Sequence, residues 1–509
     1  MLFSLPFAFP LLANRTYLPR AEQVEQAGIY SLLLSMGISV AVGAVLFVVG
    51  RQVKPSPLFR KEAMAIVGLS WVLATVLGAL PYYLCGIQTA PEQPITFIEA
   101  MFESQAGFST TGATVLTDLE TPERVPHCLL FWRSWTHFLG GLGIVVLFVA
   151  ILGQGSAGKA MVRAEMPGPS KEGSMPRMQH TALVFAGIYV GLNLSLTLIY
   201  MLEGMTLFDG LCHAFGTMAT GGFSTYNRSL GGFDSSLIEY TTIVFMILAG
   251  TNFTLLYLTL LGGPKRLFAD IEFRTFVGII LLVTTGIIFF GVRAGDTGFE
   301  SWDSALRNSM FQVVSVITTT GYGTADFDHW NNFARGSLLV VMFIGGCAGS
   351  TGGGMKVIRH VLFFRILQRE IELSYRPRVV RLIRIGGTIA DDPAMLRGIM
   401  VYFCLILGIF IASWMLLVTF EPSTTWGYSE DSPGSRAQST LDEKLLDCAS
   451  AVTATLNNIG PGLGVVGPTQ NYAGFSQGAK FLFVWLMLLG RVEVFSILVL
   501  VFPSFWRRS

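Results

Sequence analysis

The stretch Thr318-Thr319-Thr320-Gly321-Tyr322-Gly323 is the part of the sequence from which the fold can be worked out. A glycine lets the chain turn its backbone carbonyl groups to one side, because it has no Cβ to resist the necessary dihedral angles. Rings of such carbonyls replace the hydration shell of an ion in selective pores. A ring needs four loops around one axis. Either four chains each supply one loop, or this chain carries three more.

The composition indicates a multi-pass membrane protein. Of 509 residues, 52% are hydrophobic and 13% are charged, whereas soluble domains carry about 25% charged residues. Apolar segments run from end to end and leave no room for a large soluble domain. The net charge of +1 gives no indication of nucleic-acid binding. Six scattered cysteines and six scattered histidines predict neither a disulfide framework nor a zinc site.

Three further polar stretches between apolar segments resemble the first one. They are Ser109–Thr114, Ala219–Phe223 and Asn457–Gly462. A lone T-T-G is usually an ordinary turn, but four such stretches at regular spacing, each between two spans, indicate internal repeats. The predicted fold is therefore an all-α polytopic membrane protein. Four pseudo-repeats of helix, pore loop and helix surround one central pore.

The repeats can be delimited from the apolar spans. An N-terminal pair of helices, the first one short, precedes them. The expected ranges are 1–62 for the N-terminal helices, 63–153, 181–263, 275–372 and 396–509 for the repeats. The span Thr181–Leu202 opens the second repeat, Thr275–Val292 the third and Leu396–Phe420 the fourth. We expect the returning spans Leu237–Leu261 and Ala479–Phe502 to be continuous.

A short helix is predicted before each loop. The four segments are Phe97–Phe108, Phe208–Met218, Asp303–Ile317 and Asp442–Thr455, and the expected N-caps are Thr96, Thr206, Ser301 and Thr440. If the C-termini of these helices point at the axis, their partial negative charge favours a cation there. Non-helical backbone at membrane depth is tolerated only where it is buried or lines a water-filled path.

The candidate ion ligands are main-chain groups of one triplet in each loop. The glycines predicted to be equivalent are Gly112, Gly221, Gly321 and Gly460. The full set is Thr110, Thr111, Gly112, Ala219, Thr220, Gly221, Thr319, Thr320, Gly321, Asn458, Ile459 and Gly460. Ile459 stands where the other loops have threonine. A site made of carbonyl groups tolerates that change, whereas a site made of side chains would not.

The charges predict the orientation. The connections between repeats are rich in lysine and arginine, which places them in the cytoplasm and turns all four loops outward. Acidic residues flank the loops. Some of them are expected simply to cap helices or keep the loops solvated, and together they would also raise the local cation concentration at an external mouth. They are Glu99, Glu103, Asp118, Glu120, Asp209, Asp303, Asp326, Asp328, Asp442 and Asp447.

Longer runs carry a resemblance to a known family. They are Phe102–Thr114, the RAEMPGP run at Arg163–Pro169, Gly345–Lys356, Ala454–Gly464 and the GRVE run at Gly490–Glu493. On these residues the chain resembles the membrane subunits of the Trk/Ktr/HKT potassium transporter superfamily, most closely the bacterial TrkH type, over nearly its whole length. It departs in its very short N-terminus and in its third loop, which is closer to ordinary potassium channels.

The resemblance implies a function. Members of the superfamily take up K⁺ across the inner membrane, and a serine at the position of Gly112 goes with sodium transport in part of it. We therefore expect a channel-like pore for K⁺ and Rb⁺. TrkH-like subunits are homodimers on a cytosolic TrkA-like nucleotide-binding ring, so no nucleotide is expected on this chain. Membrane lipids are further expected partners.

The resemblance also implies a gate beneath the loops. The gate residues are Gly345, Gly346, Gly349, Gly352, Gly353, Gly354 and Arg491. Six glycines in ten positions should break the helix, because each costs about 1 kcal/mol relative to alanine. For Arg491 and Glu493, a structural ion pair is the other reading. The basic stretch Arg369–Arg397 could obey the positive-inside rule, bind anionic lipid or dock the regulatory ring.

Parts of the sequence also resemble the motifs of three other kinds of protein. The G-x-G-x-x-G of Gly462–Gly467 lacks the strand, helix and acid of a dinucleotide site. The run Gly349–Lys356 lacks the G-K-[ST] of a P-loop, so the chain is not expected to be an ATPase or another enzyme. A secondary transporter that couples K⁺ to H⁺ or Na⁺ stays open. Mid-span carboxylates, which such coupling would use, are scarce apart from Glu493.

Overall fold

The computed structural model describes residues 1–8, 19–52, 60–90, 93–143, 175–378, 382–385, 388–389, 393–426, 434–492 and 494–507. The RAEMPGP run and Glu493 lie outside these residues. Helices make up most of the described chain, and short strand pairs are found at β1 (Gln88–Ala90) with β2 (Gln93–Pro94) and β3 (Arg384–Ile385) with β4 (Thr388–Ile389). The all-α prediction is confirmed.

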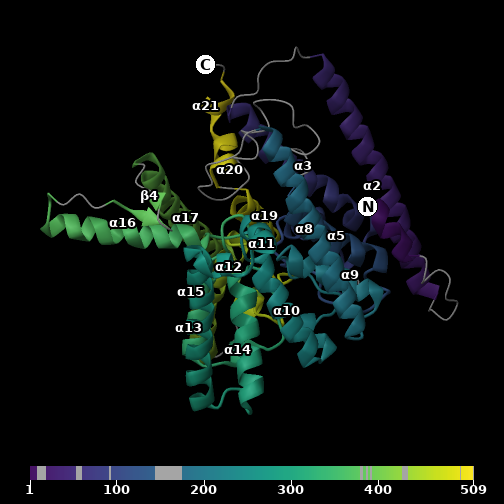
Figure 1. The fold of residues 1–509 in the computed structure, drawn as a ribbon. Helices are drawn as coiled ribbons and strands as arrows, with labels where there is room; N and C mark the ends of the chain where they lie inside the picture. Colours follow the sequence, from purple (N-terminus) through teal and green to yellow (C-terminus); the bar gives the residue numbers. More distant parts are fainter. Residues whose placement is uncertain are drawn as a thin grey trace.

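The N-terminal part consists of the 3₁₀ helix η1 (Leu2–Ala8) and the long helix α2 (Pro19–Arg51). Helix α2 lies along one edge of the molecule (Figure 1). Many of its apolar side chains are exposed, including Tyr30, Val40 and Phe47. An apolar surface of this length without a protein cover fits the hydrocarbon core of a membrane.

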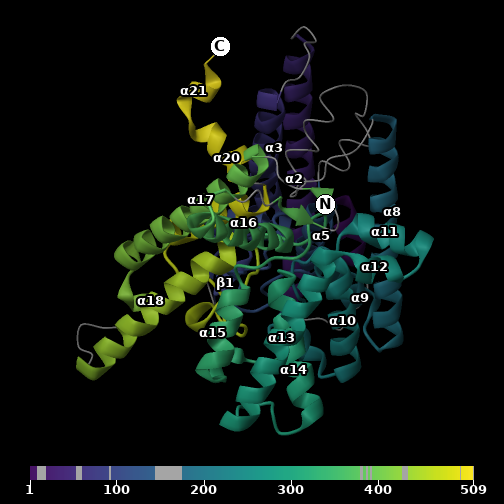
Figure 2. The same cartoon turned by 60° about the vertical axis from the view of Figure 1, so that its left-hand side comes forward.

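Four helix–loop–helix units follow. The first comprises α3 (Arg60–Cys85), α4 (Phe97–Phe108) and α5 (His127–Leu142); the second comprises α8 (Met175–Leu202), α9 (Leu207–Met218), α10 (Ser236–Ala249) and α11 (Phe253–Gly262). After α12 (Lys265–Ala269), the third comprises α13 (Ile271–Ala294), α14 (Trp302–Ile317), α15 (Asn332–Val341) and α16 (Val357–Tyr375). The fourth comprises α17 (Pro393–Phe420), α18 (Gly434–Leu456), α19 (Gln477–Arg491) and α20 (Val494–Val501), with α21 (Pro503–Trp506) after it. Helices α16 and α17 project together from one side (Figures 1 and 2).

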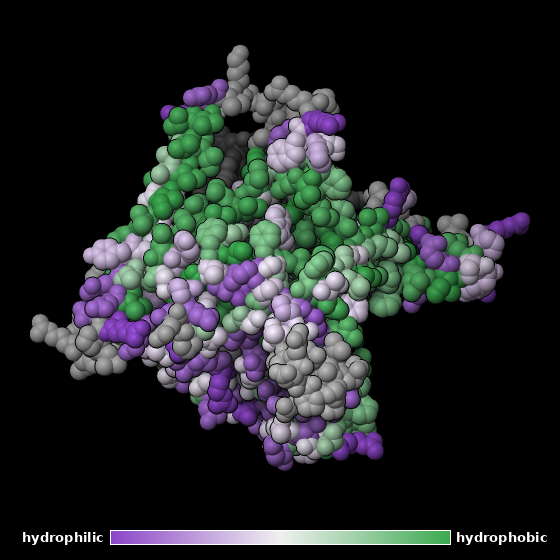
Figure 3. Space-filling view, turned by 180° about the vertical axis from the view of Figure 1, so that it is seen from behind, coloured by the Kyte–Doolittle hydropathy of each residue, from purple (hydrophilic) through white to green (hydrophobic). Residues whose placement is uncertain are grey.

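Five described helices are long and apolar enough to cross a membrane, and a bent pair makes a sixth. The five segments are Arg20–Arg51, Met64–Cys85, Leu183–Leu202, Ile271–Ala294 and Met395–Phe420. Apolar residues cover the upper part of the face in Figure 3, and hydrophilic residues gather below them. The last three of these spans agree with the predicted spans Thr181–Leu202, Thr275–Val292 and Leu396–Phe420.

Two of the predicted returning spans are not continuous. The predicted span Leu237–Leu261 is bent by 101° between α10 and α11. Gly250 ends α10, and the Asn252 side chain caps α11 by accepting hydrogen bonds from the Thr254 and Leu255 N–H groups. The span predicted at Ala479–Phe502 divides into α19 and α20. The predicted break in the third unit is confirmed, because α15 ends at Val341 and α16 begins at Val357.

Three of the four predicted N-caps are confirmed. The side chains of Thr96, Thr206 and Ser301 each accept a hydrogen bond from the backbone N–H three residues later. The prediction for Thr440 is wrong, because α18 begins at Gly434 and residue 440 lies within the helix.

The buried core divides into two main apolar clusters. One joins the first unit to the fourth, with Phe102 and Phe483 among its fully buried members. The other joins the second unit to the third, with Phe276 and Phe311 at its centre. The units therefore pack in pairs around the loops that lie between them.

Candidate functional site

The helices that precede the four loops, α4, α9, α14 and α18, all end in the same hydrogen-bonded turn. After α4, Thr110 N–H donates to Gly107 O (3.1 Å) and Thr111 N–H donates to Ala106 O (2.9 Å). This is a Schellman motif, in which the loop amides bond back to the end of the helix. The amides are used there, so the carbonyl groups of the loop are free to point elsewhere.

One residue in each turn has a left-handed backbone. The φ angles are 52° at Thr110, 54° at Thr220, 57° at Thr319 and 56° at Asn458. Glycine usually takes this position, and a β-branched residue there is a genuine outlier. Such conformations cost about 1–3 kcal/mol each and concentrate at functional sites. Three strained threonines at equivalent positions mark these loops as the site.

A glycine with positive φ follows two residues later in each loop. The values are 76° at Gly112, 77° at Gly222, 78° at Gly321 and 97° at Gly460. In the second loop the equivalent glycine is therefore Gly222, and the predicted equivalence of Gly221 is off by one residue. Ala219 is the C-cap of α9, as Ser109 is of α4. The sequence T-G-G fits either register, and the backbone angles decide between them.

The four loops form a closed ring in chain order. A Cβ atom added to Gly112 would overlap the carbonyl oxygen of Gly221 in the second loop. The other three glycines meet the next loop in the same way: Gly222 meets Thr320 O, Gly321 meets Ile459 O, and Gly460 meets Thr111 O. Each loop thus needs a glycine where the carbonyl of its neighbour passes.

The carbonyl groups in this ring are suited to a cation. Among the described residues, the oxygens of Thr111, Thr320 and Ile459 accept no hydrogen bond. Buried backbone oxygens are normally paired, so a set left open around one axis calls for another partner. A dehydrated K⁺ ion is the partner that rings of carbonyl groups accept in ion-selective pores.

A buried ion pair braces the first two loops. Arg133 Nε and Glu103 Oε2 are 3.0 Å apart, and both side chains are almost fully buried. Glu103 Oε1 accepts hydrogen bonds from Thr114 Oγ1 (2.6 Å) and Val115 N–H (2.7 Å), beyond the first loop. Arg133 donates to Ser224 O (3.0 Å), beyond the second. The pair therefore joins the segments that follow the first and the second loop.

The side chains of one histidine and two tyrosines also make hydrogen bonds to the loops. His137 Nδ1 lies 2.8 Å from Gly107 O, and His137 Nε2 accepts the Phe223 N–H at 3.2 Å. These contacts fix the tautomer with the proton on Nδ1. The Tyr322 hydroxyl donates to Phe223 O (3.3 Å), and the Tyr472 hydroxyl donates to Gly460 O (2.7 Å). Tyr322 therefore joins the third loop to the second, whereas Tyr472 braces the fourth loop from within its own unit.

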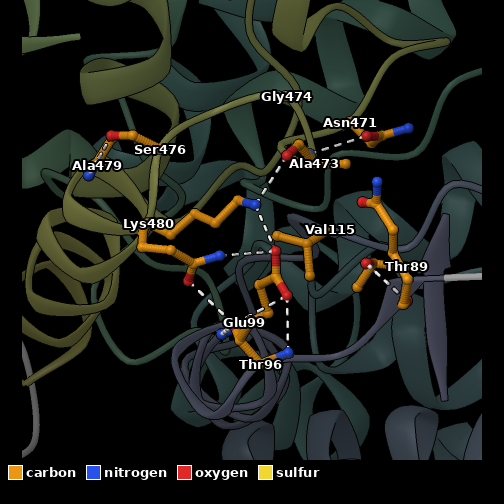
Figure 4. Close-up of polar contacts among 12 residues, drawn as sticks. Thr89, Thr96, Glu99, Val115, Asn471, Ala473, Gly474, Ser476, Ala479 and Lys480 are labelled. Carbon is orange, nitrogen blue, oxygen red and sulfur yellow. Dashed lines mark hydrogen bonds and ion pairs between the residues drawn. The ribbon is translucent and has the colours of Figure 1, made fainter. Parts of the chain in front are cut away.

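The first and fourth units are joined by a second buried pair, shown in Figure 4. Lys480 Nζ lies 2.6 Å from Glu99 Oε1 and donates to Ala473 O at 2.8 Å. Glu99 Oε2 also accepts the Thr96 N–H, which completes a capping box. Glu99 and Glu103, two of the acids that flank the loops, are each paired with a buried cation, and Glu99 also caps a helix, as was predicted for some of these acids.

Asp328 lies at the junction of the third and fourth units and is half-buried. Its carboxylate accepts the Gly464 N–H at 3.1 Å. Burial raises the pKa of Asp328 to about 6, and the nearby Asp326 and Asp447 carboxylates add to the effect, while the Gly464 N–H and Arg335 oppose it. This group changes its charge close to neutral pH.

The segment between α15 and α16, residues 342–356, is named the glycine loop. It lies against the break in the second unit, because Cys347 N–H donates to Gly250 O (2.8 Å) and Phe253 N–H donates to Gly349 O (3.0 Å). Its two arms pair through Gly345 N–H to Met355 O at 2.7 Å. The glycine loop is thus hydrogen-bonded to the second unit at the bend between α10 and α11.

The glycine loop touches the ring of loops directly. Gly353 N–H donates to Thr319 Oγ1 (2.8 Å), and a Cβ on Gly353 would lie 2.7 Å from Asn458 Cβ. Arg491 donates to Thr351 O (2.7 Å) and to Gly140 O (2.6 Å), so it joins the glycine loop to α5. The predicted gate residues, Gly345–Gly354 and Arg491, are brought together next to the loops.

Two charged residues at the glycine loop were missed by sequence reasoning. Glu272 lies at the start of α13 and accepts hydrogen bonds from two backbone amides, Ala348 N–H within the loop and Ile358 N–H just after it. Lys356 is fully buried and donates to Gly352 O. The available signal was an ionisable residue beside an apolar span, which marks a candidate functional position.

The fold and the ring define a multi-pass membrane protein in which four loops of one chain surround a single axis. A family model described as TrkH, cation transport protein, matches residues 29–425. The Trk system potassium uptake protein TrkH of Salmonella typhimurium is 36% identical over 92% of this chain and 91% of that protein. Its counterpart from Halomonas elongata is 34% identical over 100% of this chain and 97% of that protein.

A solved structure agrees with these relatives. The crystal structure of the potassium transporter TrkH from Vibrio parahaemolyticus matches with a TM-score of 0.79 and 33% identity, over 99% of this chain and 97% of that one. The chain belongs to the TrkH family of cation transport proteins.

Proposed function

We propose that this protein takes up K⁺, and also Rb⁺, across the bacterial inner membrane through a channel-like pore. The observation that carries the proposal is the ring in which each glycine meets the carbonyl oxygen of the next loop. A rigid ring of open carbonyls replaces the hydration shell of an ion without reorganisation. The selectivity filter consists of the predicted triplets, with Gly222 in place of Gly221 as the equivalent glycine. Relatives named potassium uptake proteins support the choice of ion.

The glycine loop is the proposed gate. It lies against Thr319 and Asn458 of the filter, and Arg491 holds it through Thr351 O. A backbone segment in this place blocks the path of an ion that leaves the filter, and the guanidinium adds a positive charge that opposes a cation. Movement of α16, which follows the loop, opens the pore.

The proposed assembly is a homodimer with one pore in each chain, regulated by a cytosolic TrkA-like nucleotide-binding ring. The four loops face outward, because the connections between repeats carry the excess of basic residues. In this orientation α16 and the basic stretch that begins at Arg369 face the cytosol and are available to the ring. The name Trk system, shared by the relatives, supports a multi-component assembly.

Flux measurements on purified protein in liposomes test the proposal. K⁺ and Rb⁺ should pass far better than Na⁺ or Li⁺, and equal fluxes of Na⁺ and K⁺ would refute it. Reversal potentials measured while K⁺, Na⁺ and pH are varied one at a time test the rival mechanism. A potential that follows only the K⁺ gradient supports a channel, whereas one that shifts with pH or Na⁺ indicates a coupled secondary transporter.

A further inference from the structure

Glu272 lies in the first turn of α13, and its side chain is directed at the glycine loop. The residue is 7% exposed. Its Oε1 accepts hydrogen bonds from two backbone amides, Ala348 N–H at 2.7 Å and Ile358 N–H at 3.0 Å. The two amides are ten residues apart in the chain: Ala348 lies in the first arm of the loop, and Ile358 lies just beyond the second arm, at the start of α16. One oxygen atom therefore holds both arms.

The two arms also pair with each other next to this contact. Gly345 N–H donates to Met355 O (2.7 Å), and Val357 N–H donates to Gly346 O (3.2 Å). These two bonds close the base of the loop, which is called the neck. Beside the neck, the Glu272 carboxylate accepts one backbone N–H from each side of the loop. Buried amides need an acceptor, and at these two positions the acceptor comes from a different helix rather than from the loop itself.

Charged groups surround this contact. Lys356 is buried within the neck, and its ammonium group is attracted to Glu272 and repelled by Arg491. The two hydrogen bonds to Glu272 need only an acceptor oxygen, so the fastening does not depend on the charge of the side chain.

We propose that Glu272 is a positioning residue that fastens both arms of the glycine loop to α13 and confines the movable part of the gate to residues 349–355. This inference rests on the proposed function of the loop as the gate. Without the fastening, the arms separate, the neck opens and the loop leaves the pore without the regulatory partner.

Three variants test the contact. Glu272→Ala removes the acceptor, whereas Glu272→Gln keeps an oxygen of the same reach that can accept both amides. Thr284→Ala, on the same helix α13, is the matched control, because Thr284 is buried and its hydroxyl has no hydrogen-bond partner among the described residues. If Glu272→Ala does not fold, Glu272→Asp replaces it, since its shorter side chain moves the oxygen away from the amides.

Cys347 provides a readout that does not depend on transport. Its side chain is 1% exposed, and it directly precedes Ala348. The full-length protein in liposomes, with the exposed Cys404 replaced by serine, is treated with a maleimide, and labelling of Cys347 is measured by peptide mass spectrometry. The second readout is K⁺ and Na⁺ flux in the same liposomes without any partner protein.

In Glu272→Ala we expect labelling of Cys347 to rise at least tenfold and partner-free K⁺ flux to rise severalfold, with the K⁺/Na⁺ flux ratio within twofold of wild type. Glu272→Gln and Thr284→Ala should stay within about twofold of wild type in both readouts. Unchanged labelling in Glu272→Ala overturns the inference, as does a Gln variant that behaves like Ala. Increased labelling without increased flux supports the fastening and contradicts the role of the loop as the gate.

Discussion

Replacing Gly112 with serine perturbs the ring at a single point. Gly112 has a φ of 76°, and a Cβ atom there would overlap the carbonyl oxygen of Gly221. The substitution therefore does two things. It places a side chain in a left-handed conformation, and it pushes the neighbouring carbonyl out of the ring. The serine hydroxyl then adds an oxygen that was not part of the ring.

The size of the effect follows from the strain. A left-handed backbone costs a residue with a Cβ roughly 1–2 kcal/mol relative to glycine. The protein lowers this strain by shifting the Gly221 carbonyl, and the shift spoils the fit to K⁺ more than the fit to the smaller, more strongly hydrated Na⁺. Since about 1.4 kcal/mol is a factor of ten, we expect the K⁺/Na⁺ selectivity to fall by roughly fivefold to thirtyfold.

The assay is a comparison of ⁸⁶Rb⁺ and ²²Na⁺ uptake into liposomes that contain equal amounts of folded protein. Gly112→Ala separates the effect of the Cβ atom from that of the hydroxyl. Gly187→Ser, on α8, is the matched control, because a Cβ there meets nothing within 4 Å. If Gly112→Ser is folded and its flux ratio equals that of wild type, the ring is not the selectivity filter.

Three further results are expected. Mixtures of wild-type chains with chains that carry a blocked filter should transport K⁺ in proportion to the wild-type fraction, because each chain supplies all four loops. Arg491→Ala, or deletion of several glycines from Gly345–Gly354, should raise K⁺ flux without the partner while selectivity survives, because the loop loses its anchor or its length. Lowering the external pH through about 6 should reduce K⁺ flux. Burial raises the pKa of Asp328 to about 6, so at lower pH this side chain loses its charge and its charge-assisted hydrogen bond from the Gly464 N–H. Asp328→Asn should remove most of this pH dependence.

Each of these results has a clear contrary outcome. A steep dominant-negative loss in mixed samples would mean that chains share a filter. Arg491 variants with wild-type flux in the absence of the partner would exclude the loop as the gate. For Asp328, the pKa is higher in the folded than in the unfolded protein, so protonation between pH 6 and 4 should stabilise the fold. A loss of thermal stability in wild type over that interval, absent in Asp328→Asn, would contradict this assignment.

The short helices could be predicted closely because their boundaries are set locally. The predicted segment Phe97–Phe108 coincides with α4, and Asp303–Ile317 begins one residue inside α14. An N-cap residue with a hydroxyl group fixes one end of each helix, and a left-handed turn fixes the other. Both signals depend only on residues close in sequence. The start of the fourth helix was misjudged, because α18 begins at Gly434, six residues before the predicted cap Thr440.

The remaining errors concern contacts between distant segments. Gly221 and Gly222 are both glycine, and only the positive φ of Gly222 and its contact with the Thr320 carbonyl show which one is equivalent to Gly112. The break at Gly250 is matched to the glycine loop about a hundred residues later, through Cys347 N–H. Glu272 looks like an ordinary acid at a helix start until its partners, 76 and 86 residues away, are known.

The contact between Thr319 and Gly353 joins the proposed gate to the proposed filter through a single hydrogen bond. Thr319 holds a strained left-handed backbone, and its hydroxyl accepts the Gly353 N–H. A glycine at this position would relieve the strain but would leave that buried amide without its acceptor. Threonine is therefore the residue that serves both the ring and the loop. When the loop leaves, Thr319 loses the contact that compensates its strain, so opening the gate must also change the energy of the third filter loop.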